Sequence, residues 1–526
     1  MTASTRQLAG IVGAAVVVAA SVGAGLLPIV TSVIGVLGVC ACGMLVLTVL
    51  GVRRTLPSRH SEERADHGHV RPGAALRLGE EQDSEVGSLS LRLARVLFYV
   101  GSVLVGQSAF RWAAGLTLSE AMFIASFALC VFSVLRGNPI VGIPTPVVAA
   151  VGIFVVGGSI SSLDAQSPTG SGFQVVHAAY TLLLWPCVGV MVLRTRRQLM
   201  TTITLWSISA AIDGLDAIFQ VIGVHVIGPA RAGNRMTGLT ENPNDLGGVT
   251  SIALVPALLT AARSVGDQRH LFRAARWLPV ALIATGLVLS GSVAGMAAGG
   301  VALLVWLSAP AVRAPARVAV IAALVCALAV VALSDGKVTS PLQRLAQVTS
   351  PASTGVNGSG QDRISVIQQA WPRIESDPFV GTGLDVYDTD VTIISHAYSV
   401  RYQIHGLPIA AWYETGIFGV AGLIGLLVAL AMIGWRSARA AATDDDLLVA
   451  WALVAGFVAF VIEAMTQPMV FQQYGWITAV LLIAWNGHAD FVPAPLRRGE
   501  FGAASDTQTR PTRWRAGQLE PAPRGS

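Results

Sequence analysis

Long apolar segments follow one another along most of the chain, and they limit what it can fold into more than any other feature. An α-helix needs about 20 consecutive apolar residues to cross the hydrocarbon core of a bilayer. Charged residues make up 12% of the chain, hydrophobic residues make up 53%, and the mean hydropathy is +0.63. Soluble proteins carry about 25% charged residues. The pattern therefore predicts an all-α polytopic membrane protein with about 12–14 transmembrane helices.

The length criterion gives about fourteen candidate spans. Several of them are short or weakly apolar, so the range of about 12–14 stays open. The candidates are 8–28, 31–52, 94–109, 116–135, 146–160, 173–193, 200–222, 246–262, 277–291, 293–310, 318–334, 406–434, 447–467 and 474–487.

The distribution of basic residues predicts the orientation of these spans. If the N-terminus is cytoplasmic and every candidate crosses, 27 of the 35 Arg and Lys residues fall on one side of the membrane and 8 on the other. Cytoplasmic loops carry an excess of Arg and Lys. The count therefore predicts a multi-pass protein of the cell membrane with both termini in the cytoplasm. The pI near 9.2 has the same explanation, so no nucleic-acid partner is predicted.

This topology divides the chain into six parts. They are N-terminal spans (1–52), a cytoplasmic loop (53–93), a transmembrane core (94–334), an extracytoplasmic loop (335–405), C-terminal spans (406–487) and a cytoplasmic tail (488–526). The two cytoplasmic segments are rich in Arg, Glu, Pro and Ser, and we expect them to be disordered. All five cysteines lie in apolar stretches, and neither a metal site nor a cofactor is predicted.

Basic residues on the outer side run against the positive-inside bias and need another explanation. Arg231 and Arg235 lie in "RAGNRMTGLTENPNDLGG", and Arg363 lies in "SGQDRISVIQQAW". A guanidinium is permanently charged and offers a planar fork of donors that matches phosphate oxygens. Together they would suit a diphosphate held at the membrane surface. A solvated charge or a structural salt bridge is the alternative for each arginine alone.

One histidine stands at the outer membrane surface. His405 immediately precedes the apolar run of span 406–434. The unperturbed titration of histidine lies near neutral pH, which suits accepting a proton from a hydroxyl. The alternative is a helix cap or a hydrogen-bond partner, and His396 is a competing candidate.

Other polar residues near the membrane have structural and functional interpretations. Asp213 and Asp216 share one face of span 200–222, where they could line a substrate groove or pair with Arg235. Asn242 and Asn244 could bind substrate or cap the helix that follows. Glu414 could orient a partner or be structural.

Three sequence segments that contain these residues, called patches below, together resemble a known family. "GNRMTGLTENPNDLGG", "DRISVIQQAWPRIESDPFVGTGLDVY" and "HGLPIAAWYETGIFGVAGL" appear in the order typical of the O-antigen ligase and Wzy-type polymerase superfamily. The long outer loop lies between spans as in that family. The resemblance covers about residues 170–485.

The resemblance implies a membrane glycosyltransferase of GT-C-like architecture. Such enzymes pass a glycan from a polyprenyl-diphosphate carrier to an acceptor hydroxyl, with inversion and without a metal or nucleotide sugar. Arg235 and Arg363 would hold the diphosphate, and His405 would activate or orient the acceptor. The candidate substrate-binding residues are Arg235, Arg363, Arg231, Asn244, Asp216 and Glu414.

Two positions depart from the family pattern. Val293 stands where an arginine is common, and Gly406 stands where an asparagine usually follows the histidine.

The resemblance implies three partners: a lipid-linked glycan donor, a glycan or envelope acceptor and the membrane. A transporter or flippase of lipid-linked oligosaccharide is the alternative, and an inactive envelope scaffold is a weaker one.

Overall fold

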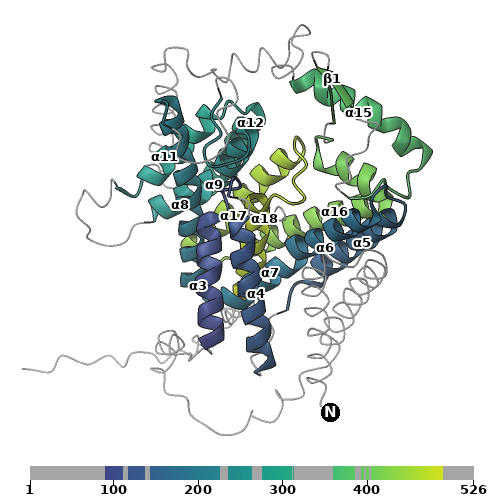
Figure 1. Ribbon diagram of the computed structural model, residues 1–526. Helices are drawn as coiled ribbons and strands as arrows, with labels where there is room; N and C mark the ends of the chain where they lie inside the picture. The colour runs from purple at the N-terminus through teal and green to yellow at the C-terminus, as the bar shows by residue number, and fades with distance from the viewer. Residues whose placement is uncertain are drawn as a thin grey trace, which may run out of the picture. The chain divides into compact units, whose positions relative to one another are not determined.

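The structure is a computed structural model, and it describes only part of the chain (Figure 1). The predicted spans 8–28, 31–52 and 318–334 lie outside the described residues, as do Arg231 and His396. The described residues are 89–110, 117–136, 142–224, 235–263, 275–310, 312, 359–384, 392–395, 398–401 and 404–489.

Helices coincide with every candidate span that falls within the described residues. Seven helical segments there are long and apolar enough to cross a membrane, so the prediction of an all-α multi-pass membrane protein is confirmed. The helices are α3 (Leu89–Leu104), α4 (Leu118–Leu135), α5 (Thr145–Leu163), α6 (Pro168–Ala179), η3 (Tyr180–Leu184), α7 (Trp185–Val192), α8 (Arg196–Val221), α9 (Pro243–Ala262), α11 (Leu278–Leu289), α12 (Val293–Leu307), α15 (Ser359–Ser376), α16 (Leu407–Arg439), α17 (Asp444–Ala464) and α18 (Gln473–Ala489).

Capping residues fix where several of these helices begin. Thr117 caps α4, and Glu120 completes the capping box three residues later. Thr195 and Gln198 do the same for α8. Because the first backbone N–H groups of a helix have no partner within it, these side chains satisfy donors that lipid could not.

Contacts between helix termini define two opposite ends of the bundle. Arg196 at the start of α8 pairs with Asp445 at the start of α17, and Arg263 after α9 pairs with the same carboxylate. We call this the arginine end. At the opposite end, the start of α9 meets the end of α17, through the hydrogen bond from Gln467 Nε2 to the Asn244 carbonyl. We call that the site end.

Helix α9 lies inside the bundle and contacts several neighbours. Its most apolar stretch is 89% buried, and it packs against α8, α11, α12 and α17. Gly247 and Gly248 at its start allow this packing, since a Cβ at these positions would meet Ser292 and the Tyr474 ring. The glycine pair of "PNDLGG" therefore brings α9 close to the starts of α12 and α18.

The predicted span 173–193 is one helical path with a π turn inside it. Helices α6 and α7 are joined by η3, which ends two residues before Pro186. A proline cannot donate to the preceding turn and clashes with it, so the regular hydrogen-bond ladder is interrupted there.

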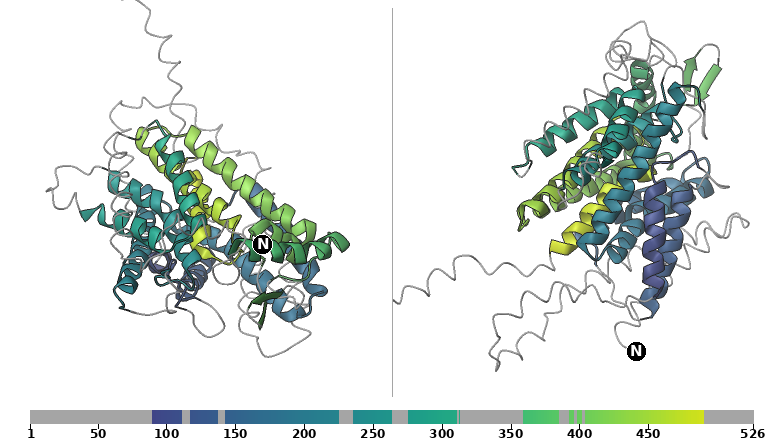
Figure 2. Two further views of the ribbon diagram at one scale, coloured as in Figure 1. Left: turned by 90° about the horizontal axis from the view of Figure 1, so that it is seen from above. Right: turned by 90° about the vertical axis from the view of Figure 1, so that its left-hand side faces the viewer.

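The segment predicted as a long polar loop (335–405) contains regular structure in its described part. Helix α15 packs through Val366, Ala370 and Ile374 onto the start of α16. A short antiparallel hairpin, β1 (Thr392–Ser395) and β2 (Tyr398–Arg401), lies beside α15 (Figures 1 and 2). The hairpin is an addition to the all-α prediction.

Candidate functional site

Two of the three sequence patches form one backbone seam. The Thr382 N–H donates to the Tyr413 carbonyl at 2.9 Å, and the Gly383 N–H donates to the Glu414 carbonyl at 3.0 Å. The Ile417 N–H donates to the Pro378 carbonyl at 3.0 Å. The loop after α15 thus satisfies the backbone groups of α16 at the point where that helix is broken.

The break in α16 requires glycine. Gly416 has φ +67°, a left-handed conformation that glycine adopts without strain. A Cβ at Gly416 would collide with the Phe379 carbonyl, and a Cβ at Gly381 would collide with the Glu414 backbone. The "GTG" and "ETG" elements are therefore two sides of one contact. This contact gives Glu414 a structural role through its carbonyl, which is one of the two roles expected for it.

Arg235 is held at the site end by two neutral acceptors. Its Nε donates to the Ser290 carbonyl at 2.9 Å, and its Nη2 donates to the Asn244 Oδ1 at 2.6 Å. The side chain lies against Gly291, in the turn between α11 and α12. Arg235 therefore contacts the turn that precedes Val293, the position where an arginine is common in the family pattern and this chain has valine.

The two asparagines of the first patch have different roles. Asn242 is the N-cap of α9 and accepts from the backbone N–H groups of Asn244 and Asp245. The capping alternative is thus confirmed for Asn242. The Asn244 side chain instead orients Arg235.

Arg363 reaches the same region from α15. It is half-buried and interacts electrostatically with Glu463, near the end of α17. Glu463 is fully buried and accepts a hydrogen bond from Gln467 Nε2 at 3.1 Å. Gln467 Nε2 also donates to the Asn244 carbonyl at 3.2 Å. A continuous set of hydrogen bonds therefore runs from Glu463 through Gln467 and Asn244 to Arg235, and Arg363 lies within electrostatic range of its first member.

His405 lies beside the end of α17. The N-cap position of α16 belongs to Gly406, so the alternative that His405 is the cap residue is wrong. Gly406 has φ +101°, and a Cβ there would lie 3.1 Å from the Met465 carbonyl. The preceding Ile404 packs with Val366 of α15. His405 is half-buried between these two contacts, which join it to the elements that carry Arg363 and Glu463.

The two aspartates of α8 are buried near the start of the first patch. Asp216 accepts a hydrogen bond from Gln220 Nε2 at 2.9 Å, and Gln220 also bonds to Thr237 and the Gly238 carbonyl. Asp213 is fully buried one turn earlier. Through Gln220, Asp216 is thus joined to Thr237 and Gly238 in the segment that leads from Arg235 into α9.

Several residues that the structure brings into polar contact were not predicted as candidates from the sequence. Glu463 and Glu120 are carboxylates within or at the start of apolar segments, a signal that the scan for polar residues in spans could have used. Gln467, His177 and Tyr474 carry no comparable pattern. Among the described residues, no group of three His, Cys, Asp or Glu side chains could hold a metal ion.

Comparison with known families supports the resemblance. A family model described as O-antigen ligase matches residues 278–424, so the chain carries an O-antigen ligase family domain there. The matched region contains the second and third patches, Arg363 and His405. The first patch precedes it and is joined to it through the hydrogen bond from Arg235 to Ser290. No curated protein matches the chain.

Proposed function

We propose that this multi-pass membrane protein, with its O-antigen ligase family domain, is a glycosyltransferase that uses a polyprenyl-diphosphate glycan as donor. The family suggests ligation or polymerisation of cell-envelope glycans. The acceptor is a hydroxyl of a glycan or another envelope component, and the reaction takes place on the outer face of the cell membrane.

One observation carries the proposal. Arg235 lies at one end of a hydrogen-bond network at the site end of the bundle, and Arg363, from a distant part of the sequence, lies within electrostatic range of Glu463 at its other end. Both belong to the minority of basic residues that the predicted topology puts on the outer side. Cations on that side are suited to an anionic headgroup that projects from the bilayer.

The reaction assigns a step to each residue. The acceptor oxygen attacks the anomeric carbon of the donor while the bond from that carbon to the phosphate oxygen breaks. Arg235 and Arg363 stabilise the charge that develops on the departing diphosphate, and fixed cations contribute most where such charge appears. His405 accepts the proton of the attacking hydroxyl.

Supporting residues set the geometry of these groups. Asn244 holds one arm of Arg235, and Ser290 holds the other through its carbonyl. Glu463 is the carboxylate near Arg363. Arg231, Asp216 and Glu414 remain candidates for donor binding.

The test uses purified protein in detergent with a synthetic polyprenyl-diphosphate oligosaccharide and a soluble acceptor. We expect transfer of the glycan, and we expect Arg235→Ala, Arg363→Ala and His405→Ala to abolish it while expression and folding persist. Asp445→Asn at the arginine end is the control and should retain transfer. Full activity in any two of the three variants would contradict the assignment. Movement of the donor lipid across vesicles without transfer would favour a flippase instead.

A further inference from the structure

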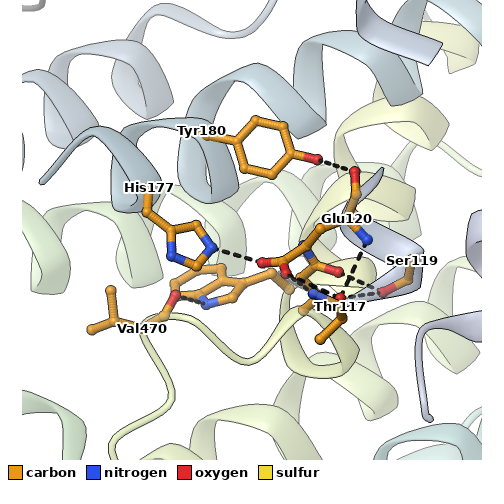
Figure 3. Close-up of polar contacts among 8 residues, drawn as sticks. Thr117, Ser119, Glu120, His177, Tyr180 and Val470 are labelled. Atoms are coloured by element: carbon orange, nitrogen blue, oxygen red, sulfur yellow. Dashed lines mark hydrogen bonds and ion pairs between the residues drawn. The ribbon is translucent and has the colours of Figure 1, made fainter. Parts of the chain in front are cut away.

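Glu120 of α4 and His177 of α6 form a close side-chain pair away from the three sequence patches. Glu120 Oε1 and His177 Nε2 are 2.7 Å apart, with 4% and 16% of their side chains exposed (Figure 3). Glu120 also accepts hydrogen bonds from the Thr117 N–H and hydroxyl within the capping box of α4. The Tyr180 hydroxyl reaches the Glu120 carbonyl at 3.5 Å, from the first residue of the π turn. The pair therefore locks α6 and η3 to the start of α4.

Helices α4 and α6 also contact the connection between α17 and α18 (Met465–Gln472) and the first residue of α18. The His177 ring stacks on Phe471 with 4.9 Å between centroids and 23° between planes. The Ser119 hydroxyl donates to Gln473 Oε1 at 2.9 Å. The Trp476 indole N–H bonds to the Met469 and Val470 carbonyls, which folds the connection back onto α18.

The opposite side of this connection faces the candidate site. Gln467 Nε2 donates to the Asn244 carbonyl at 3.2 Å. The Tyr474 hydroxyl bonds to Asp245 Oδ1 at 3.0 Å. Asn244 in turn orients Arg235. The connection and the first residues of α18 are thus anchored to the Glu120–His177 pair and its helices on one side and to the start of α9 on the other.

We propose that the Glu120–His177 pair is a positioning brace for the donor site. It fixes the α17–α18 connection, and through Gln467 and Tyr474 it sets the place of Asn244 and hence the direction of Arg235. The inference rests on the proposed function only in assigning the donor diphosphate to Arg235. An alternative is that the pair is itself an acid–base dyad. The contacts favour the brace, because Glu120 is engaged by the helix cap and the His177 ring by Phe471.

A hydrogen-bonded pair suits this role better than an apolar contact. Leaving a buried carboxylate such as Glu120 without its partner is costly, so the pair disfavours arrangements of α4 and α6 that separate it from His177. Misplacing a diphosphate-binding guanidinium by a small distance is costly, since phosphate recognition by arginine is directional.

The first experiment measures the segment directly and needs no activity. Amide hydrogen exchange is followed in detergent for wild type, Glu120→Gln, His177→Ala and His177→Gln, with Asp445→Asn as the matched ion-pair control. We expect exchange of residues 465–473 to rise roughly fivefold or more in His177→Ala, less in the two conservative variants and not at all in Asp445→Asn. Unchanged exchange in all three brace variants would overturn the brace.

The second experiment separates positioning from catalysis. We expect His177→Ala to raise the donor KM roughly 5- to 30-fold, with the acceptor KM unchanged. His177→Gln should recover part of this loss. Adding Gln467→Ala to His177→Ala should bring little further loss, because both act on Asn244; independent destabilisation would add instead.

The outcomes distinguish the two proposals. If Arg235→Ala impairs transfer while the brace variants leave the donor KM unchanged, the brace is wrong and the glycosyltransferase assignment stands. If Arg235→Ala and one of Arg363→Ala and His405→Ala both keep full activity, the assignment itself fails, and the exchange data alone decide whether the brace exists. A fall in kcat at constant donor KM and constant exchange would identify a catalytic dyad and overturn the brace.

Discussion

The hydrogen bonds of Arg235 at the site end differ from those of Arg196 and Arg263 at the arginine end. At the arginine end, Arg196 and Arg263 both reach Asp445, at 2.6 and 2.7 Å, and these groups are partly exposed. Burial lowers the pKa of the Arg263 guanidinium, and Asp445 opposes that effect. At the site end, Arg235 donates to a backbone carbonyl and an amide oxygen, neither of which carries a charge.

The difference separates two uses of the same residue type. An arginine that shares a carboxylate at a partly exposed helix start ties helices together and marks the side of the membrane. Arg235 has its direction fixed by hydrogen bonds to a backbone carbonyl and an amide oxygen. That second arrangement suits recognition of an anion, and four predictions test it, from the largest expected effect to the smallest.

The comparison depends most strongly on Arg235. Replacing it with alanine removes a fixed cation from the developing diphosphate charge, and we expect transfer to fall about 10²- to 10³-fold. Arg235→Lys should recover only part of the activity, because an ammonium cannot bond to Ser290 and Asn244 as a planar fork does. Initial rates with a synthetic donor measure both effects. Equal rates for Arg235→Lys and wild type would show that charge alone matters.

The seam at Gly416 is the next most sensitive point. Gly416→Ala imposes a left-handed conformation on a residue with a Cβ and drives it into the Phe379 carbonyl. We expect a loss of about 2 kcal/mol or more in stability. Thermal unfolding in detergent measures it. Gly425→Ala in the same helix is the control: its Cβ would meet Ala150 at an ordinary 3.5 Å, so no loss is expected. Equal melting temperatures for the two variants would contradict the seam.

Asn244 tests whether neutral acceptors fix the arginine. Asn244→Ala removes one hydrogen-bond acceptor of Arg235 but leaves its charge. We expect about a tenfold loss of transfer, the value of one hydrogen bond to a charged group. Asn242→Ala is the comparison, since its effect should fall on helix stability through the lost cap. Loss of transfer in Asn242→Ala at unchanged stability would break this distinction.

The arginine end should tolerate the corresponding change. Asp445→Asn removes the carboxylate shared by Arg196 and Arg263, yet partly exposed ion pairs contribute little, so we expect about 1 kcal/mol or less in stability. Transfer should stay at the wild-type rate. A loss of transfer as large as that of Arg235→Ala would remove the contrast between the two ends.

The helices could be predicted from the sequence because hydropathy and length define them. The candidates 200–222 and 246–262 differ from α8 and α9 by a few residues at their ends. Those differences arise from polar caps such as Thr195 and Asn242, which extend a helix beyond its apolar core. The regular structure within 335–405 was missed because α15 is short of apolar residues and packs by one face only.

The sequence analysis could single out the charged candidate residues of the site, but not the residues that contact them. Arg235, Arg363 and His405 stand out because they oppose the charge bias or adjoin a span. Asn244 was identified, but whether it caps the helix or binds Arg235 depends on a side-chain direction that no pattern encodes. Gln467 and His177 act through contacts between residues far apart in the chain, and one sequence contains no record of such pairs.

The enclosure of α9 has a consequence for how a lipid substrate gains entry. Protein covers nearly all of its apolar length, whereas the corresponding stretch of α4 is 39% buried and that of α16 50%. If the proposed polyprenyl-diphosphate donor binds at the site end, its tail would run along the less enclosed helices, because α9 offers it almost no exposed apolar length.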